Sequence, residues 1–365
     1  MEQTVKVNLG KRSYTISIGA GNLARIGTQA ASMERARNAV VVSDARVAAL
    51  YGRQVADALS AAGLAASLLS FPAGEVHKTL ATVSALMDGL FAVQPPVDRS
   101  TLVIALGGGV SGDVAGFVAA TALRGLRYLQ CPTTLLAAVD SSIGGKTGVD
   151  HPAGKNLIGA FHQPSAVVVD VRTLKTLPVE ELRNGLAECV KHAVIRDLSL
   201  LDFIETHADA LLACDEQLMA TLIARNVTIK AAVVSADERE AGQRAHLNFG
   251  HTIGHAIETL GGYGAMGHGH AVSLGMAAAC HLAARRNLSD AAIGRRVEGL
   301  LRRLGLPVRH AGLDGKKIWQ LMQHDKKALG GKVRMVLPTG DGRVELFDDI
   351  AEAEVLHAVE YLKKR

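Results

Sequence analysis

The sequence is poor in aromatic residues, in cysteine and in proline. Phe, Trp and Tyr make up 4% of its 365 residues, only 4 residues are cysteine and 9 are proline, and no run of Lys and Arg reaches five residues. Few aromatics disfavour a single-strand nucleic-acid binder, which stacks bases on aromatic side chains. The net charge of +5 is typical of a mildly basic soluble protein, or of one whose excess cations line a pocket for a small anion.

The cysteines and the apolar stretches limit the class of protein further. Cys131, Cys189, Cys214 and Cys280 are far apart and form no CxxC pair. This spacing disfavours a zinc knuckle or a disulfide framework and favours reduced thiols. The N-terminal stretch alternates polar and apolar residues like a strand, and it lacks the apolar region of a signal peptide. No uncharged apolar stretch reaches 18 residues, so we expect no membrane span and a cytoplasmic protein.

Strand and helix patterns alternate in the first half of the chain. Apolar, β-rich stretches predict strands at 4–8, 13–18, 39–43, 66–71, 101–106, 127–131 and 166–170. Helical patterns lie between them at 46–62 and 79–92. After about residue 178, helical spacing dominates, at 179–192, 197–214, 216–234, 250–260, 270–286 and 289–304. We expect an α/β, Rossmann-like nucleotide-binding domain with an open parallel sheet over 1–175, and a mostly α-helical domain over 176–365.

A glycine-rich loop follows the clearest buried strand. Gly107, Gly109 and Gly112 satisfy G-x-G-x-x-G and open a helical pattern. Such a loop lets the backbone approach a pyrophosphate at a helix N-terminus, although a tight turn that needs glycine only for packing gives the same pattern. No acidic residue follows at about 20 residues to hold a ribose. Asp44 or the loop 72–78 would then hold the adenosine half of a dinucleotide.

A second polar, glycine-rich stretch covers 140–148, and Lys155 and Asn156 follow it. Its Gly-Gly-Lys-Thr resembles the end of a P-loop, but the P-loop pattern requires glycine where Val139 stands. A stretch of this kind is usually a surface loop. Because it lies between two predicted buried strands, we interpret it as a binding loop.

The helical half contains a cluster of polar residues within an otherwise apolar sequence. Burying such residues costs free energy unless they are hydrogen-bonded, paired or bound to a metal. Glu188, Lys191 and His192 share the polar face of the helix predicted over 179–192, and an H-x-x-x-H and an H-x-H pair follow downstream. Two histidines and one carboxylate with an open fourth position form a catalytic zinc arrangement, which can polarise a substrate hydroxyl. The spacing leaves the choice open among His192, His251, His255, His268 and His270.

Eight basic residues adjoin these segments or lie in polar breaks of their own. Each alone fits a solvated surface charge, and only the fold decides whether they converge. They are Arg124, Lys146, Lys155, Lys191, Lys230, Arg244, Lys326 and Lys327.

Together these segments resemble the 3-dehydroquinate synthase family, one of the sugar phosphate cyclases. The matching stretches span nearly the whole chain: 74–80 (GEVHKTL), 105–117 (ALGGGVSGDVAGF), 132–164, 185–192 (GLAECVKH), 236–240 (ADERE), 247–258 (LNFGHTIGHAIE) and 325–327 (DKK). The resemblance implies conversion of 3-deoxy-D-arabino-heptulosonate 7-phosphate to 3-dehydroquinate and phosphate, in the shikimate pathway to aromatic amino acids. It implies transient oxidation of the C5 hydroxyl by NAD, phosphate elimination, re-reduction and intramolecular aldol closure.

The resemblance also assigns roles to residues. It implies that one divalent ion, zinc or cobalt, is held by Glu188, His251 and His268. Catalytic roles fall to Lys146, Lys155, Asn156, Lys191 and His255. The substrate is bound by Arg124, Lys230, Arg244, Asn248 and Lys326 or Lys327, with Arg124 reaching the neighbouring subunit of a homodimer. The NAD site comprises Asp44, Glu75, Lys78, Gly109, Val110, Ser111, Gly112, Asp113, Thr133, Thr134, Asp140, Lys146, Lys155, Thr173, Leu174, Lys175 and Thr176.

One position departs from the family pattern, and three other functions remain to be weighed. His270 stands where the family usually has glutamate, and its imidazole could compete for the metal. A related cyclase that makes another carbocycle is disfavoured by Arg244 and Asn248, which suit a carboxylate substrate. A metal-dependent polyol dehydrogenase needs no phosphate or carboxylate pocket, and a nucleic-acid binder is supported by the basic charge alone.

Overall fold

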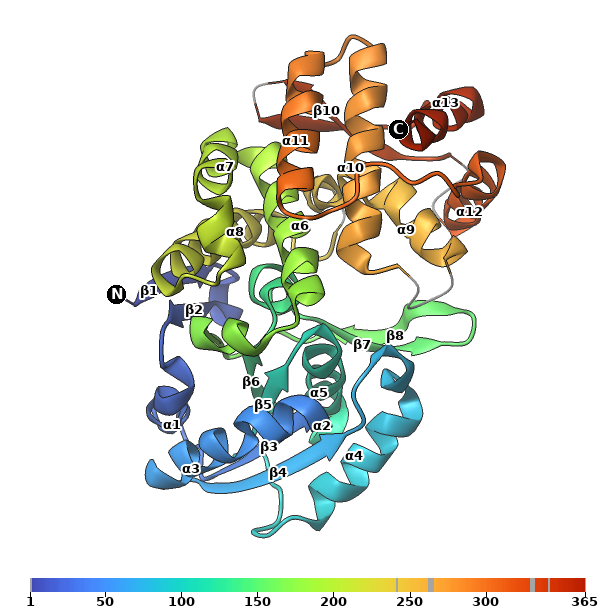
Figure 1. The fold of residues 1–365 in the computed structure, drawn as a ribbon. Helices are drawn as coiled ribbons and strands as arrows, with labels where there is room; N and C mark the ends of the chain where they lie inside the picture. The colour runs from blue at the N-terminus through green and yellow to red at the C-terminus, as the bar shows by residue number, and fades with distance from the viewer. Residues whose placement is uncertain (1, 241, 262–265, 329–331, 341, 365) are drawn as a thin grey trace. The chain divides into compact units, whose positions relative to one another are not determined.

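The computed structural model describes residues 2–364 apart from 241, 262–265, 329–331 and 341, and only the backbone of 324–328. Its contacts divide the chain into two compact units, Met1–Leu177 with Met219–Arg239, and Pro178–Leu218 with Glu240–Arg365 (Figure 1). The expected boundary after residue 175 lies close to the first break. The segment Met219–Arg239 differs, because the sequence pattern puts it in the helical half and the contacts group it with the first unit. Within this segment, Lys230 and Glu238 form ion pairs with Asp140 and Arg12 of the first unit.

The first unit is built on a seven-stranded sheet of order β1-β2-β9-β6-β5-β3-β4. Its strands are β1 (Gln3–Val7), β2 (Tyr14–Gly19), β3 (Asn38–Asp44), β4 (Ala65–Phe71), β5 (Leu102–Gly107), β6 (Arg127–Pro132) and β9 (Ala166–Asp170). Every neighbouring pair is parallel except β1 and β2. The expected α/β domain is confirmed, and each predicted strand of this half is present within a few residues of its predicted ends.

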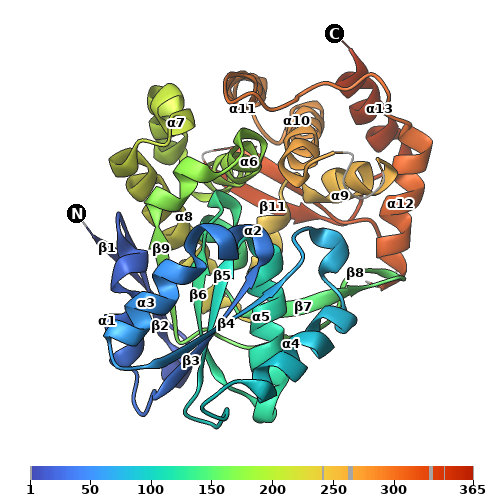
Figure 2. The same cartoon turned by 60° about the horizontal axis from the view of Figure 1, so that its bottom comes forward.

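Helices cover both faces of this sheet, and alternate residues of β3 distinguish the two layers. Val40 and Val42 pack in one apolar cluster with α4 (Leu80–Ala92) and α5 (Gly109–Thr121). Ala39 and Val41 pack in another with α1 (Ile26–Ala31) and α3 (Arg53–Ala61). Figure 2 shows α1 and α3 on one side of the strands and α4 and α5 on the other. Since successive strand residues point to opposite faces, a strand covered on both sides needs a continuous apolar run.

The polar stretch predicted as a binding loop at 140–148 ends in a β-hairpin instead. Strands β7 (Lys146–His151) and β8 (Gly154–Phe161) pair antiparallel. A Cβ added to Gly148 would lie 2.3 Å from the Ile158 carbonyl oxygen, and one added to Gly159 would lie 2.2 Å from that of Thr147. These glycines therefore allow the two strands to approach closely. The sequence analysis did not predict the hairpin because its composition is typical of loops.

Short helical turns join the strands and helices of the first unit. They are η1 (Gly10–Arg12), η2 (Asn22–Arg25), α2 (Ala45–Val47), η3 (Ala48–Gly52), η4 (Glu75–His77), η5 (Ala122–Arg124), η6 (Ala137–Ser141) and η7 (Val171–Thr176).

The second unit is mostly helical, as predicted. Its helices are α6 (Val179–Arg196), α7 (Leu198–Leu212), α9 (His251–Leu260), α10 (His268–Arg285), α11 (Ala291–Arg303), α12 (Gly315–Ala328) and α13 (Glu352–Lys363). The turn η8 (Gln243–Asn248) and the hairpin of β10 (Met335–Gly340) and β11 (Arg343–Phe347) complete it. The helical patterns that we used ended near residue 304 and did not include α12 and α13.

Helix α8 (Glu216–Ala236) begins in the second unit and continues in the first. By length and composition it is apolar enough to cross a membrane, but 61% of its apolar window is buried inside the protein. Its apolar character is therefore that of a core helix.

Glycine residues allow the backbones of helices α9 and α10 to contact each other. A Cβ added to Gly275 of α10 would lie 1.8 Å from the carbonyl oxygen of Gly250, which directly precedes α9. A Cβ on Gly254 would lie 3.0 Å from the Ala271 oxygen. The two backbones are therefore in contact, and this fixes how the first residues of the two helices, His251 and His268, lie.

Candidate functional site

Apart from Asp140 in η6, Lys146 in β7 and Lys155 in β8, the residues expected to hold NAD follow five neighbouring parallel strands, at the edge of the sheet formed by their carboxyl ends. This is the edge at which open α/β sheets bind ligands. They are Asp44 at the end of β3, Glu75 and Lys78 after β4, Gly109, Val110, Ser111, Gly112 and Asp113 after β5, Thr133 and Thr134 after β6, and Thr173, Leu174, Lys175 and Thr176 after β9.

The loop after β5 requires glycine at two successive positions. Gly107 has φ +145°, and a Cβ there would lie 2.5 Å from Ser111 Oγ. A Cβ on Gly108 would lie 3.0 Å from a methyl carbon of Thr134. Gly108 precedes α5, whose first turn has neither a side-chain cap nor an acidic residue. The positive end of the α5 dipole therefore meets a glycine-lined loop, as at phosphate-binding helix termini.

Asp44 connects the end of β3 to this loop. Its Oδ2 accepts a hydrogen bond of 3.0 Å from Ser111 Oγ, and its Oδ1 accepts from the amides of Arg46 and Val47. The loop and the strand end are thus held in one arrangement. No other described acidic side chain bonds to this loop's Ser111, so Asp44 is well placed for the role that the sequence suggested.

Lys78 lies in a buried polar cluster of the same unit. Its Nζ is 2.6 Å from Asp113 Oδ2 and also donates to Asn156 Oδ1. Burial alone would lower the pKa of Lys78, but the charge and hydrogen bond of Asp113, with the charges of Glu75 and Asp150, outweigh burial and raise it. Lys78 is therefore a permanent cation that holds the start of α5 and the β8 strand.

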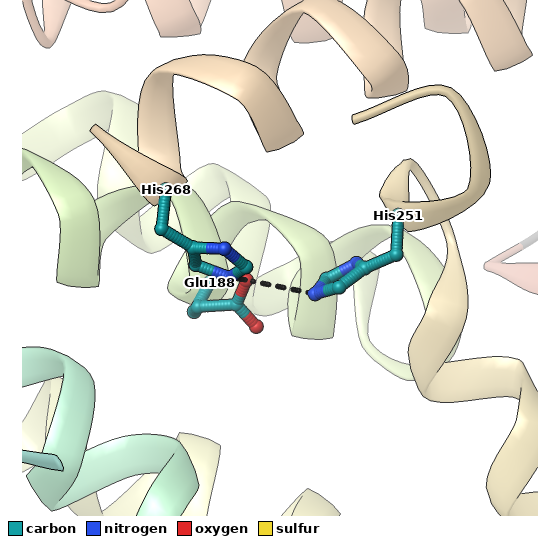
Figure 3. A group of neighbouring side chains, drawn as sticks. All are labelled: Glu188, His251 and His268. Atoms are coloured by element: carbon teal, nitrogen blue, oxygen red, sulfur yellow. Dashed lines mark ion pairs between the residues drawn. The ribbon is translucent and has the colours of Figure 1, made fainter. Parts of the chain in front are cut away.

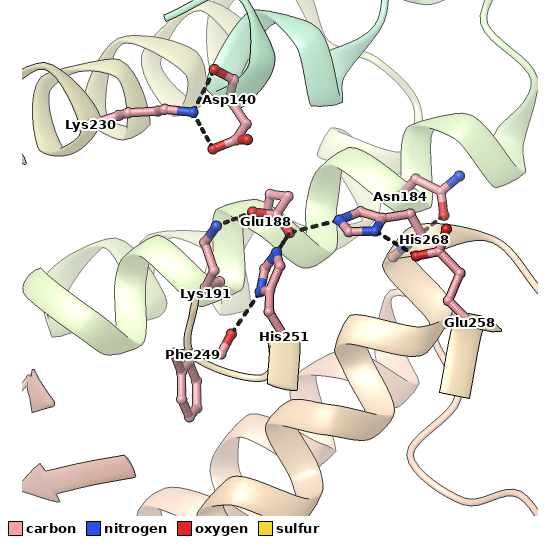
Figure 4. A network of polar contacts seen from close by, with 10 residues as sticks. Asp140, Asn184, Glu188, Lys191, Lys230, Phe249, His251, Glu258 and His268 are labelled. Atoms are coloured by element: carbon pink, nitrogen blue, oxygen red, sulfur yellow. Dashed lines mark hydrogen bonds and ion pairs between the residues drawn. The ribbon is translucent and has the colours of Figure 1, made fainter. Parts of the chain in front are cut away.

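Two further lysines of the first unit contact acidic groups. Lys230 Nζ donates to both the Oδ1 and the carbonyl oxygen of Asp140, each at 2.6 Å (Figure 4). Lys155 Nζ lies 3.7 Å from Glu75 Oε1. Lys146 is exposed at the first position of β7.

Arg124 lies apart from these residues. It is exposed in η5, just after the C-terminus of α5, with φ +63°. The glycine loop precedes the other end of that helix, about 18 Å away at 1.5 Å per residue. The structure therefore does not bring Arg124 to the NAD-site residues of its own unit.

In the second unit, Glu188 of α6 faces two imidazoles. Its side chain is 1% exposed. His251 Nε2 lies 3.4 Å and His268 Nε2 3.6 Å from the same carboxylate oxygen, Oε1 (Figure 3). The other carboxylate oxygen, Oε2, forms an ion pair with Lys191 Nζ. Burying a carboxylate is costly unless cations pair with it, and Oε1 is the oxygen that faces the two imidazoles.

In both imidazoles the outer nitrogen, which is Nδ1 and faces away from Glu188, already lies beside an oxygen atom, as Figure 4 shows. His251 Nδ1 is 3.1 Å from the Phe249 carbonyl oxygen, and His268 Nδ1 is 3.1 Å from Glu258 Oε2. Two ligands of a tetrahedral zinc ion, with bonds of about 2.1 Å, lie about 3.4 Å apart. The three candidate ligand atoms lie within 4.8 Å of one another, so these residues fit one divalent ion with the inner nitrogens facing it.

The charged groups of this cluster shift one another's pKa values. Burial alone would raise the pKa of Glu188, but Lys191, which forms an ion pair with its Oε2, and the two histidines hold it well below the usual value. Burial lowers the pKa of His251 to about 3, so that ring is neutral and can act as a ligand. Burial would also lower the pKa of His268, but hydrogen bonds with Glu188 and Glu258 outweigh it and raise the pKa to about 9.

The other candidate histidines lie differently. His255 is exposed one turn after His251, with its ring centroid 5.2 Å from that of His251 and 6.0 Å from that of His268. His270 Nε2 lies 3.1 Å from Glu180 Oε2, so this ring faces Glu180. His192 is fully buried on α6. The geometry therefore favours His251 and His268 beside Glu188.

The remaining expected substrate residues are only partly described. Arg244 is buried and Asn248 is exposed, and both lie in η8. Lys326 and Lys327 fall in the last turn of α12, where the side chains lie outside the described part of the chain.

Sequence reasoning missed two residues that support the cluster. Glu258 contacts His268, and Asn184 Oδ1 accepts a hydrogen bond of 2.9 Å from the amide of Gly269. The sequence could have indicated Glu258, because it follows His251 and His255 at helical spacing on one face. No sequence pattern could have indicated Asn184, because its partner is a backbone group of another helix.

Comparisons with known proteins show the family of the chain. Family models of the 3-dehydroquinate synthase N-terminal and C-terminal parts match residues 68–184 and 185–328. The chain is 46% identical to the 3-dehydroquinate synthase of Desulforamulus reducens, over 97% of this chain and 98% of the relative. It is 45% identical to that of Symbiobacterium thermophilum, over 98% of this chain and 100% of the relative. The chain belongs to the 3-dehydroquinate synthase family.

Solved structures place the family within the sugar phosphate cyclases. The 2-epi-5-epi-valiolone synthase of Streptomyces hygroscopicus subsp. jinggangensis, with NAD⁺ and Zn²⁺ bound, is 31% identical with a TM-score of 0.87, over 97% of this chain and 98% of that one. A 2-deoxy-scyllo-inosose synthase complexed with carbaglucose-6-phosphate, NAD⁺ and Co²⁺ is 27% identical with a TM-score of 0.88, over 98% and 100%. The glycerol dehydrogenase of Schizosaccharomyces pombe, at 16% identity and a TM-score of 0.68, shares the fold alone.

Proposed function

We propose that this protein converts 3-deoxy-D-arabino-heptulosonate 7-phosphate to 3-dehydroquinate and inorganic phosphate, with NAD and one divalent metal ion, zinc or cobalt. The observation that carries the proposal is the buried Glu188 carboxylate facing two imidazoles whose outer nitrogens are already held. It occurs in a chain that matches 3-dehydroquinate synthases over nearly its full length.

The residues of the chain divide the work between binding and proton handling. When bound, NAD supplies reversible hydride acceptance and the metal ion polarises a substrate hydroxyl. The glycine loop 107–112 and the start of α5 bind the NAD pyrophosphate, and Asp44 binds the adenosine half. Lys146, Lys155 and Asn156 bind and orient the substrate. The exposed ring of His255, beside the cluster, relays protons.

The substrate is an anion with a carboxylate and a phosphate, and cationic side chains select it. Buried Arg244 suits the carboxylate as a bidentate donor. Lys191, Lys230, Asn248 and a lysine of the 326–327 pair provide further charge and hydrogen bonds. Because the hydride removed at the first step returns at a later one, the net reaction is redox-neutral and releases phosphate.

The reaction is tested with purified protein, 3-deoxy-D-arabino-heptulosonate 7-phosphate, NAD and zinc. We expect equal amounts of phosphate and 3-dehydroquinate and no net NADH. Glucose 6-phosphate, which lacks the carboxylate, is the matched control substrate and should release no phosphate. NADH accumulation without phosphate release would indicate a dehydrogenase, and turnover of only the carboxylate-free sugar phosphate would indicate a related cyclase.

We also propose a homodimer in which Arg124 binds the phosphate of the substrate in the neighbouring subunit. Its distance from the NAD-site residues of its own unit, about 18 Å along α5, supports this role. A cytoplasmic location is proposed as well, and it is supported by four buried cysteines with no disulfide among them.

Subunit complementation tests the role of Arg124. Arg124→Ala and Glu188→Gln chains, each inactive alone, are co-expressed. If Arg124 acts on its neighbour, one site of each mixed dimer has both residues, and about a quarter of the parent activity returns. If Arg124 acts within its own chain, no site has both residues and no activity returns.

A further inference from the structure

We propose that Glu258 is a positioning residue for the metal site. Its carboxylate accepts the Nδ1–H of His268 and so presents the His268 Nε2 lone pair to the cation at Glu188. The inference rests on the metal site of the proposed function, and it adds a residue outside the three candidate ligands.

The contact joins two helices. Glu258 lies in the third turn of α9 and His268 is the first residue of α10. Glu258 Oε2 is 3.1 Å from His268 Nδ1, while His268 Nε2 is 3.6 Å from Glu188 Oε1, on the other side of the ring (Figure 4). Glu258 therefore touches the nitrogen that faces away from the cation and is not a ligand in this arrangement.

The chemistry of the contact fixes which nitrogen can coordinate. An ionised carboxylate only accepts hydrogen bonds, so Nδ1 must carry the ring proton. In a neutral imidazole the other nitrogen then has a free lone pair. A carboxylate behind a ligating histidine also holds the ring orientation and makes the ring a stronger ligand.

The two imidazoles differ in how they are held. The Nδ1 of His251 is near the carbonyl oxygen of Phe249, two residues earlier, so a local backbone contact orients this ring. The orientation of His268 instead depends on the Glu258 side chain, which is 13% exposed. Replacing Glu258 should therefore loosen one candidate ligand and leave the other in place.

The chain offers a matched control in Glu180. Its Oε2 lies 3.1 Å from His270 Nε2, the same distance as in the Glu258–His268 pair. His270 belongs to the same first turn of α10 but faces away from the Glu188 cluster. Glu180→Ala therefore removes a carboxylate–imidazole contact of the same length, from a more exposed side chain and without changing a candidate ligand.

The test measures zinc affinity of purified, metal-free protein by competition with a chromophoric chelator. Glu258→Ala should raise the zinc Kd about 10- to 100-fold, and Glu258→Gln, which keeps an acceptor oxygen without the charge, should raise it less. Glu180→Ala should stay within about twofold of the parent. At saturating zinc, Glu258→Ala should recover most of the parent kcat, because the ligands themselves remain.

The outcomes separate this inference from the proposed function. If Glu188→Gln loses zinc and Glu258→Ala keeps the parent Kd, the role of Glu258 is wrong while the metal site stands. If Glu188→Gln binds zinc as tightly as the parent, the metal site fails and this inference fails with it. Should Glu258→Ala not fold by circular dichroism, the comparison of Glu258→Gln with Glu180→Gln decides, and equal Kd values would overturn the proposal.

Discussion

The contact between α9 and α10 allows a change outside the three candidate ligands to test the metal site. Gly275→Ala adds a single methyl group to a buried helix. That Cβ would lie 1.8 Å from the Gly250 carbonyl oxygen and 2.8 Å from its carbonyl carbon. Both are backbone atoms, so no side chain can rotate away. The helices must separate by more than about 1 Å to restore ordinary contact distances.

The expected cost follows from this geometry. Overpacking a core costs about 1–3 kcal/mol, and a clash with backbone belongs at the upper end. Alanine is a better helix former than glycine, which offsets up to about 1 kcal/mol. We expect a net loss of about 2 kcal/mol, which lowers the Tm by about 4–8 °C for a unit of this size. Because His251 directly follows Gly250, the same displacement should weaken zinc binding about tenfold or more.

Thermal unfolding by circular dichroism and chelator competition for zinc measure the two effects. Gly299→Ala is the matched control, because Gly299 lies exposed within α11 and a Cβ there meets nothing within 4 Å. That change should raise stability by about 0.5–1 kcal/mol and leave zinc affinity unchanged. If Gly275→Ala unfolds at the parent temperature or above and binds zinc as tightly, the described contact between α9 and α10 is wrong.

Three further predictions concern single side chains. Lys78→Met leaves the Asp113 carboxylate without its cation, so it should lower the free energy of unfolding by about 3 kcal/mol and weaken NAD binding in a calorimetric titration. Adding Asp113→Leu should restore stability but not NAD affinity. His268→Ala should lose tightly bound zinc by elemental analysis, whereas His270→Ala should retain it, and the reverse result would refute the ligand choice. Burial and nearby basic groups lower the pKa of His281 from 6.5 to about 4. The unfolded chain therefore binds a proton that the folded protein does not, and stability falls as pH drops from about 6.5 to about 4. After screening at this partly exposed site, the free energy of unfolding falls by about 1 kcal/mol over this pH range. His281→Phe should remove this part of the pH dependence of the free energy of unfolding.

The parts of the fold that sequence predicted are those encoded in continuous local patterns. Strand β5 reads as an unbroken apolar run because both of its faces are covered, and the glycine loop after it is a local motif. The β7–β8 hairpin was missed because its glycines serve a contact between two strands, which composition cannot distinguish from a loop. Helix α13 was not predicted, although the sequence contains its pattern: the buried residues Val355, Ala358, Val359 and Leu362 recur at helical spacing.

The choice among the histidines shows why spacing alone could not describe the site. The H-x-x-x-H pattern pairs His251 with His255 on one helix, yet only His251 faces the buried Glu188, and the second imidazole is His268 from another helix. The backbone contacts around this pair are Gly275 of α10 against Gly250, which precedes α9, and Gly269 at the start of α10 against Asn184 of α6. These contacts join residues 25 or more positions apart, so no short motif contains them.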